Sequence, residues 1–379
     1  MSTEVKNKIK NHKIRLYKMA DFDDAGFVPQ VEVNGKKVDA AINNKMSYGN
    51  VLDMLTEKAR KYKNAAQGIS ADQLAELQAL TVIAVEFAEA EMDDHSGALF
   101  NAVSLPNATQ TVVLQEILPY IGDEGTVSGT NDHVPLLDAT IPTKDMVKLF
   151  VRGFGWKDSL LNDALNPFYS PERVTRSAAT LSVDAKNRDF FKPVIEATYD
   201  ANHSQSPDTV GTTYHLKIRN TLEMALQKAY ALKHPVTGKR VSAMAHKNYL
   251  LCNPVDALIM RPIVAGQIGI QTTPQFMGAL DLDVIAYDGG NFDGLTYGKK
   301  TLEFPGIPQG TAYIYVKNIY GAQKVIKRNT SLAVGAGDVL ELSTERKAWH
   351  RIDGVFLDWV LPTAGAGKGA IIKITLPTR

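Results

Sequence analysis

Two acidic segments of the chain have residue types that could bind a metal ion. Asp93, Asp94 and His95 are consecutive, and consecutive side chains on a helix point about 100° apart, so these three do not converge on one ion. We interpret them as a solvated helix end. Residues 288–294 contain the glycines and aspartates of a calcium loop, but Lys299 stands where that loop needs its closing glutamate. We therefore expect a turn between two strands there.

Two further segments have residue types for phosphate binding or nucleophilic attack. Glycines flank Lys368 as in a phosphate-binding loop, but Gly369 occupies the position that requires Ser or Thr. Residues 370–375 have the pattern of a strand, so we expect a hairpin turn before them. Cys252 lies in the apolar, strand-like segment YLLCNP, which favours a buried small residue over a nucleophile. As the single cysteine, it excludes an intrachain disulfide and a cysteine-based zinc site.

Other catalytic motifs are missing from the sequence. It contains no G-x-S-x-G elbow and no H-E-x-x-H pair, and its eight histidines are scattered. The sequence therefore predicts no catalytic residue, no cofactor-binding residue, no metal ligand and no cofactor. We expect a protein that is not an enzyme.

Length and charge set the broad class of protein. The chain has 379 residues and a formal net charge of +1, so we expect two or three modules and no dominant nucleic-acid or membrane-surface role for the whole molecule. Basic residues crowd the first twenty positions; they fit either a solvated terminus or a tail that lies near an anionic partner. There is no secretory signal and no membrane-spanning stretch in the sequence, which predicts a soluble protein made in a cytoplasm.

Residues 112–155 form the most informative segment of the chain. Strand-like stretches at 112–121 and 147–154 flank a run of turn and loop residues, which predicts a two-stranded arm. An isolated two-stranded ribbon is marginal in water because it buries little apolar surface against its backbone entropy. Such an arm needs a neighbouring surface, and a second subunit is the natural candidate. The segment therefore points to assembly.

The region before the arm has its own elements. An Asn-Gly pair within residues 28–42 predicts a hairpin, and a short helix is expected at 48–62. Ser70 and Gln73 have the spacing of a capping box, and apolar residues then recur at helical spacing to about Asp93. This region could be an extended arm, an internal scaffold-like segment or an added clasp.

A long helix is expected after the arm. Residues 156–165 predict one or two helical turns, and Ser170 with Pro171 predicts the start of a longer helix that ends near Pro193. Its apolar stripe is narrow and much of its remaining surface is charged, which is typical of a helix that lies across a surface. The stripe consists of Val174, Ala178, Leu181 and Ala185.

The second half of the chain is richer in strands. An amphipathic helix is expected at 214–232, followed by a strand at 249–252 and a helix that Asn253 and Pro254 begin. This order indicates an α+β fold with a mixed or antiparallel sheet. Further strands are expected at 282–287, 312–317, 324–327, 339–343, 355–361 and 371–376.

The order of these elements, with two particular segments, resembles the major capsid protein of tailed bacteriophages, the Hong Kong 97-type fold. In IPTKDMVKLFVRGFGWKDSLLNDAL, residues 141–165, the returning strand of the arm leads toward the long helix. The segment GDVLELSTERKAWHRIDGVFLDWVLP, residues 337–362, is similar to the closing strands of that family. The resemblance extends in element order from residue 112 to residue 376.

The resemblance implies a division of the chain into capsid-type regions. These are an N-terminal arm or extension at 1–111, an E-loop hairpin at 112–155, a peripheral domain with the spine helix at 156–204, an axial domain at 205–335, and strands at 336–379 that return to the peripheral domain. Some family members crosslink an E-loop lysine to a neighbouring subunit. The tip expected here, 122–133, has no lysine, so we expect non-covalent clasping.

The resemblance also implies function, partners and location. Copies would assemble through pentamers and hexamers into an icosahedral shell that encloses double-stranded DNA and contacts it non-specifically, with scaffolding, portal and decoration proteins as further partners and no membrane. The protein would be part of the virion capsid and would assemble in the host cell cytoplasm. Three alternatives stay open: an encapsulin-type nanocompartment shell, a tail-tube or portal component, and a soluble α+β enzyme with a dispersed active site.

Overall fold

The computed structural model describes most of the chain from residue 91 onward and a few segments before it. The described residues are 30–33, 36–39, 84–85, 88–89, 91–108, 110–113, 146–159, 171–235, 238, 240–268, 275–276, 278–297, 300–318, 321–336, 344–363 and 367–378. They contain helices together with parallel and antiparallel strands, so the α+β class expected from the sequence is confirmed.

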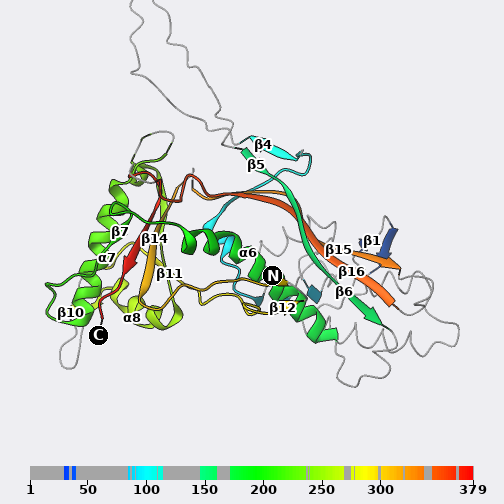
Figure 1. The fold of residues 1–379 in the computed structure, drawn as a ribbon, viewed down its shortest axis with the longest axis horizontal. Coiled ribbons are helices and arrows are strands. Elements are labelled where there is room, and N and C mark those ends of the chain that lie inside the picture. The colour runs from blue at the N-terminus through cyan, green and yellow to red at the C-terminus, as the bar shows by residue number, and fades with distance from the viewer. Residues whose placement is uncertain are drawn as a thin grey trace, which may run out of the picture.

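The molecule has a sheet-and-helix body at one end and a sheet of long strands at the other (Figure 1). The helix α6 (Pro171–Glu196) runs between the two ends. A short strand pair, β4 (Thr111–Val113) and β5 (Met146–Lys148), lies at the top of the view, and β5 packs against β16 (Thr344–Phe356) of the sheet of long strands. The order of hairpin base, long helix and α+β body is the one that the capsid resemblance implies.

The body is built on a five-stranded mixed sheet in the order β11-β8-β14-β17-β7. β14 is antiparallel to both of its neighbours, whereas β11 is parallel to β8 and β7 is parallel to β17. The apolar run of β14 is buried on both faces, as expected of a central strand. The strands are β7 (Ser204–Gln205), β8 (Ala245–Cys252), β11 (Asp283–Ala286), β14 (Thr311–Asn318) and β17 (Ile371–Thr375).

Two helices, α7 (Tyr214–Ala231) and α8 (Pro254–Val264), pack on this sheet. Helix α7 starts where the Thr213 hydroxyl accepts a hydrogen bond from the Leu216 N–H, and α8 starts at Asn253 with Pro254 in its first turn. The apolar side of α7, which includes Ile218 and Leu222, is buried in the core, as expected of the amphipathic helix predicted at 214–232. The predictions for both helices are confirmed.

The second sheet has three long strands and the short strand β3, in the order β3-β15-β16-β6. β3 is parallel to β15, and the other two pairings are antiparallel. β6 is an edge strand of this sheet as far as the described residues go. The strands are β3 (Asn101–Ser104), β6 (Phe150–Ser159), β15 (Gln323–Ala336) and β16 (Thr344–Phe356).

The base of the predicted arm is present as the antiparallel pair β4 and β5, in which Val112 lies opposite Val147. Val147 belongs to a small apolar cluster that is separate from the main core; the other buried members are Val325, Phe356 and Trp359. Most of the arm, residues 114–145, lies outside the described residues. The prediction of a hairpin is therefore confirmed at its base. The prediction of a returning strand at 147–154 is wrong in its second part, because residues 150–154 belong to β6 and pair with β16.

Helix α6 differs from the expectation in two ways. It continues through Pro193 to Glu196, because the buried side chains Phe190, Phe191 and Val194 hold its last turns against the core. It is also buried on several sides in its second half, so the expectation of a helix lying across a surface is wrong there. The reason is that charged residues of α6 form buried ion pairs with residues distant in the sequence. The sequence of the helix alone does not indicate these partners.

Two other predictions are wrong in secondary structure. Residues 156–159 were expected to be helical but belong to β6, which pairs residue for residue with β16 up to Thr344 opposite Ser159; pairing with a long neighbour overrides the local helical signal. Residues 355–361 were expected to be one strand, but β16 ends at Phe356. A turn follows, in which the Val360 N–H donates to the Leu357 carbonyl at 2.8 Å.

The N-terminal predictions are confirmed where the structure describes them. β1 (Gln30–Val33) pairs antiparallel with β2 (Lys36–Asp39), and the helix expected to end near Asp93 is helical up to Glu91. The helix expected at 48–62 and the strand at 339–343 lie outside the described residues. The remaining short elements are α4 (Ser96–Leu99), η2 (Val241–Met244), β9 (Gln267–Ile268), β10 (Gln275–Phe276), β12 (Thr296–Tyr297) and β13 (Lys300–Thr301).

No helix in the described ranges is both long enough and apolar enough to cross a membrane. The domain boundaries expected from the sequence stay a prediction. The strand pairings place β17 in the sheet of β8 and β14, next to the segment that was expected to form the axial domain.

Candidate functional site

The Asp93-Asp94-His95 segment forms a packed junction instead of a solvated helix end. Asp94 Oδ1 accepts hydrogen bonds from the backbone N–H and the hydroxyl of Ser96, at 3.0 and 2.5 Å. The His95 N–H donates to Asn187 Oδ1 at 3.0 Å, and Asn187 Nδ2 donates to the Asp93 carbonyl at 3.0 Å. The segment thus attaches the chain before β3 to α6. Among the described residues, no group of three or more His, Cys, Asp or Glu side chains is placed to hold a metal ion.

The acidic segment at 288–294 is a turn, as predicted. It packs on α6, where Asp184 accepts hydrogen bonds from the Phe292 N–H at 3.3 Å and from Asn291 Nδ2 at 3.5 Å. Asp293 Oδ1 accepts a hydrogen bond from the Phe304 N–H at 2.6 Å. Burial raises the pKa of Asp184 above its usual value, and the hydrogen bonds from the turn oppose that shift. These carboxylates hold backbone in place.

Cys252 and Lys368 also have structural roles. Cys252 is buried in β8, and its burial raises the pKa of the thiol to about 12, which keeps it in the unreactive thiol form. Lys368 lies opposite Thr363 in a tight turn and donates through Nζ to the Pro235 carbonyl at 3.1 Å. The interpretation of both residues from the sequence is confirmed.

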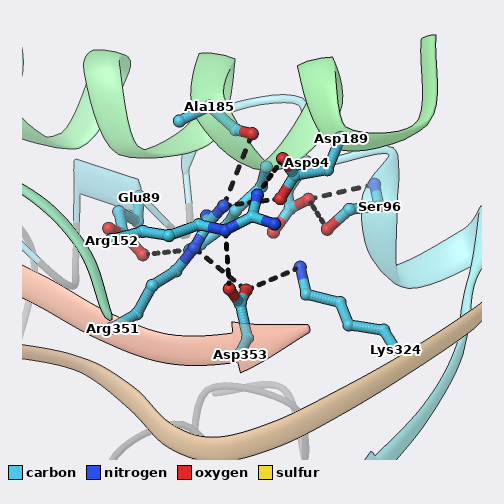
Figure 2. A network of polar contacts seen from close by, with 10 residues as sticks. Glu89, Asp94, Ser96, Arg152, Ala185, Asp189, Lys324, Arg351 and Asp353 are labelled. Atoms are coloured by element: carbon cyan, nitrogen blue, oxygen red, sulfur yellow. Dashed lines mark hydrogen bonds and ion pairs between the residues drawn. The ribbon is translucent and has the colours of Figure 1, made fainter. Parts of the chain in front are cut away.

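The most unusual feature of the described structure is a buried group of charged side chains between α6 and the long-stranded sheet, which we call the junction cluster. Figure 2 shows these side chains converging from α6, from β6, β15 and β16, and from the segment before β3. The basic and acidic members are equal in number, so their formal charges balance. The members are Arg152, Lys186, Lys324 and Arg351 with Glu89, Asp94, Asp189 and Asp353.

Asp189 lies at the centre of the junction cluster. Its Oδ1 accepts a short hydrogen bond from Arg152 Nη1 on β6, and its Oδ2 accepts one of 2.6 Å from Arg351 Nη2 on β16. The side chain of Asp189 is 4% exposed and that of Arg351 is 8% exposed. One carboxylate of α6 therefore holds two strands of the sheet.

Asp353 contacts the same two arginines from the opposite side. Its Oδ1 lies 3.4 Å from Arg152 Nε, and its Oδ2 lies 3.0 Å from Arg351 Nε and 3.8 Å from Lys324 Nζ. Neither oxygen has hydrogen-bond geometry to these groups. Asp353 therefore acts as a buried counter-charge whose contacts are ionic.

The two lysines of the junction cluster have opposite electrostatic environments. Burial by itself lowers the pKa of Lys186, but Glu89, at 2.6 Å, and Asp94 outweigh it and raise the pKa above its usual value. Burial lowers the pKa of Lys324 to about 8, with Arg351 acting in the same direction and Asp353 opposing it. Lys324 is thus the weakly compensated cation of the group.

Apolar side chains are exposed next to the arm base. Phe150 and Val151, the first two residues of β6, are 54% and 72% exposed. Val103 and Leu105, in and just after β3 at the other edge of the sheet, are also exposed. Exposed apolar residues beside an extended strand pair are typical of a surface that another chain covers.

The arrangement supports assembly better than chemistry. The candidate chemical residues from the sequence serve turns, caps, the core or, in the case of Asp94, the junction cluster. The arm base leads into β6, which carries the exposed Phe150 and Val151 and the cluster member Arg152.

Sequence reasoning missed the junction cluster. One signal was present in the sequence. Arg351 and Asp353 are two residues apart in a strand, so two opposite charges are neighbours on the same face of that strand.

Comparison with known proteins gives matches at the level of structure only. No family model matches the chain, and no curated protein matches its sequence. Solved structures similar to it include a virus-like particle from Pyrococcus furiosus, with 10% identity, 78% of this chain and 97% of that chain covered, and a TM-score of 0.41. The mature capsid of bacteriophage PhiM1 has 8% identity, coverage of 76% and 88%, and a TM-score of 0.44.

The capsid of Ralstonia phage GP4 is a third similar structure, with 13% identity, coverage of 74% and 87%, and a TM-score of 0.37. These structures are of the kind that the sequence resemblance names, namely phage capsids and a virus-like particle. At such low identities and TM-scores they carry no function over to this chain, whose function has to be argued from its own geometry.

Proposed function

We propose that this protein is a major capsid protein whose copies assemble through pentamers and hexamers into a closed icosahedral shell around double-stranded DNA. The observation that carries the proposal is the strand pair β4 and β5, which leads into the edge strand β6 with Phe150 and Val151 exposed. A ribbon of this kind gains stability when a second copy covers it. Contacts between unlike surfaces of identical copies close into rings when the rotation between them closes.

The exposed valine on β6 provides a sharp test. Val151→Asp places a charge on a side chain that is 72% exposed, so the protomer should fold normally while the apolar contact with a neighbour is lost. Val210, which is 83% exposed on a loop of the body, offers the matched control Val210→Asp. We expect the Val151 variant to yield at least tenfold fewer particles in sedimentation and electron microscopy than wild type and the control.

The same preparation identifies what the shell encloses. Particles that contain nucleic acid protected from nuclease would support a DNA-enclosing capsid, and particles that co-purify with a protein cargo and contain no nucleic acid would identify an encapsulin-type nanocompartment. Equal particle yields from wild type, Val151→Asp and Val210→Asp would show that the exposed residues of β6 do not contact a neighbouring copy. Rings that never close into shells would favour a portal or tail-tube component.

A further inference from the structure

The sheet strands β6 and β16 meet α6 at two arginines that face each other. Arg152 on β6 lies directly opposite Arg351 on β16 in the strand register. Like charges at opposite positions of a strand pair repel and destabilise the pairing. The pairing is possible because Asp189 and Asp353 each contact both arginines, one carboxylate from the helix and one from the sheet.

The position of these arginines ties them to the arm. Arg152 is four residues beyond Lys148, the end of the returning strand β5, and Asp353 lies opposite Phe150 at the start of β6. Beside Asp353, Gly354 lets the arm base approach β16 closely: a Cβ there would lie 2.4 Å from the Lys148 carbonyl oxygen. The junction cluster therefore lies directly beneath the point where the arm leaves the body.

Net stability does not account for such a cluster. Burying ion pairs costs desolvation free energy that their attraction only partly offsets, so replacing a complete buried pair by apolar residues is often neutral or stabilising. What ionic contacts do provide is a defined geometry, because a carboxylate shared by two guanidinium groups fixes the positions of all three. Asp189 is the α6 residue that transmits this geometry to the sheet.

We propose that the junction cluster fixes the orientation of the arm relative to α6. The arm then meets the neighbouring copy at the angle that shell assembly needs. The inference rests on the proposed function, since it assumes that copies join through the arm. It assigns Arg152, Asp189, Arg351 and Asp353 as positioning residues. They need not touch the neighbouring copy.

The test measures the angle and the assembly separately. Paired spin labels at Lys148→Cys and Ser177→Cys, both exposed, report the distance between the arm base and α6 after Cys252 has been replaced by alanine. The test variant combines Arg152→Met, Asp189→Leu, Arg351→Met and Asp353→Leu, which removes equal numbers of positive and negative charges. We expect its label distances to spread over a range at least twice as wide as in wild type.

Assembly is then measured on the same variant without labels. We expect the yield of closed particles of uniform size to fall at least tenfold, with irregular aggregates or open rings in their place. Should the fourfold variant fail to fold, the near-isosteric Asp189→Asn replaces it, with a smaller broadening of the distances expected. Label distances as narrow as in wild type, in whichever variant folds, would overturn the inference.

The two proposals fail in different ways. Wild-type protein that forms no shells or rings contradicts the capsid function but leaves the label distances interpretable. If both wild type and the fourfold variant form normal shells, the proposed role of the junction cluster is contradicted and the capsid function is not. Lys233→Met, which removes an exposed lysine of the body outside the junction cluster, is the control and should keep both the narrow distances and the particle yield.

Discussion

Asp189 and Asp353 each contact the two arginines through different carboxylate oxygens. Lys324, which also faces Asp353, lies farther away. Its Nζ is 3.8 Å from Asp353 Oδ2 and 5.6 Å from the ring centre of Phe100. The side chain is buried but only weakly compensated, which is why burial lowers its pKa to about 8. An unfolded lysine has a pKa of about 10.4.

This difference predicts how the free energy of unfolding depends on pH. Below pH 8 Lys324 is charged in both the folded and the unfolded state. The difference between its folded pKa of about 8 and its unfolded pKa of about 10.4 means that this charge lowers the free energy of unfolding by about 3 kcal/mol. Between pH 8 and about 10.4 the unfolded state binds more protons than the folded state, so the cost diminishes as pH rises. Lys324→Met should therefore raise the melting temperature at pH 6.5, and its advantage over wild type should shrink from pH 8 upward.

Thermal unfolding across this pH range checks the prediction. Lys233→Met, which removes an exposed lysine of the body, is the control and should show no such pH-dependent difference from wild type. A stabilisation by Lys324→Met that grows with rising pH would contradict the electrostatic account of this residue.

At the scale of elements, Gly354 decides how the arm base lies on the sheet. A Cβ at this position would lie 2.4 Å from the Lys148 carbonyl oxygen and 2.5 Å from Val147 Cγ1, too close for either to remain in place. Gly354→Ala should therefore push β5 away from β16 and destabilise the protomer by about 1–3 kcal/mol, the usual cost of overpacking. Denaturant unfolding measures the loss.

The same substitution at Gly278 is the control for Gly354→Ala. A Cβ on Gly278 would meet nothing within 4 Å, so Gly278→Ala should leave the free energy of unfolding nearly unchanged. Equal effects of the two alanine substitutions would show that the close approach of β5 and β16 is not a constraint.

The arm itself gives a further prediction at this scale. Deleting residues 122–133, the tip expected from the sequence, should leave a protomer with an unchanged melting temperature, because the core clusters of the described structure are made by other residues. Its assembly should fail, since a shortened arm cannot reach the neighbouring copy. Electron microscopy of the deletion variant checks this, and a wild-type yield of closed particles would count against the role of the arm.

Local signals in the sequence were sufficient for the elements whose structure is decided locally. Asn253 and Pro254 mark the start of α8 by capping, and the stripe of Ile218 and Leu222 marks the buried face of α7. Residues 156–159 could not be assigned from local signals, because their strand exists through pairing with β16. The class of fold and most element positions were thus predictable.

The site was much less predictable than the fold. Asp189 looks like one of several surface charges when α6 is considered alone, and its partner Arg351 lies 162 positions further along the chain. Burial of such charges depends on contacts that form only when α6 crosses the sheet. The base of the arm was predictable because its two strand-like stretches and the turn residues between them are consecutive.

At the scale of the whole molecule, two sheets are joined by α6, and the arm base leaves from the long-stranded sheet next to exposed apolar residues (Figure 1). The large buried core lies in the body around β8, β14 and β17, whereas Val147 of the arm base belongs to a separate small cluster. The body thus has its own apolar contacts, and under the proposed function further copies would contact the other end. A shell is the assembly that such one-sided contacts produce when their rotations close.

The most direct test is negative-stain electron microscopy of the purified full-length protein, with sedimentation of the same sample. We expect closed shells of uniform size, or pentamer and hexamer rings with the corresponding sedimentation coefficients. Monodisperse monomers at every concentration, whose residues 112–155 also resist proteolysis, would contradict the proposed function, because the arm would then be folded against its own body and would need no neighbouring copy.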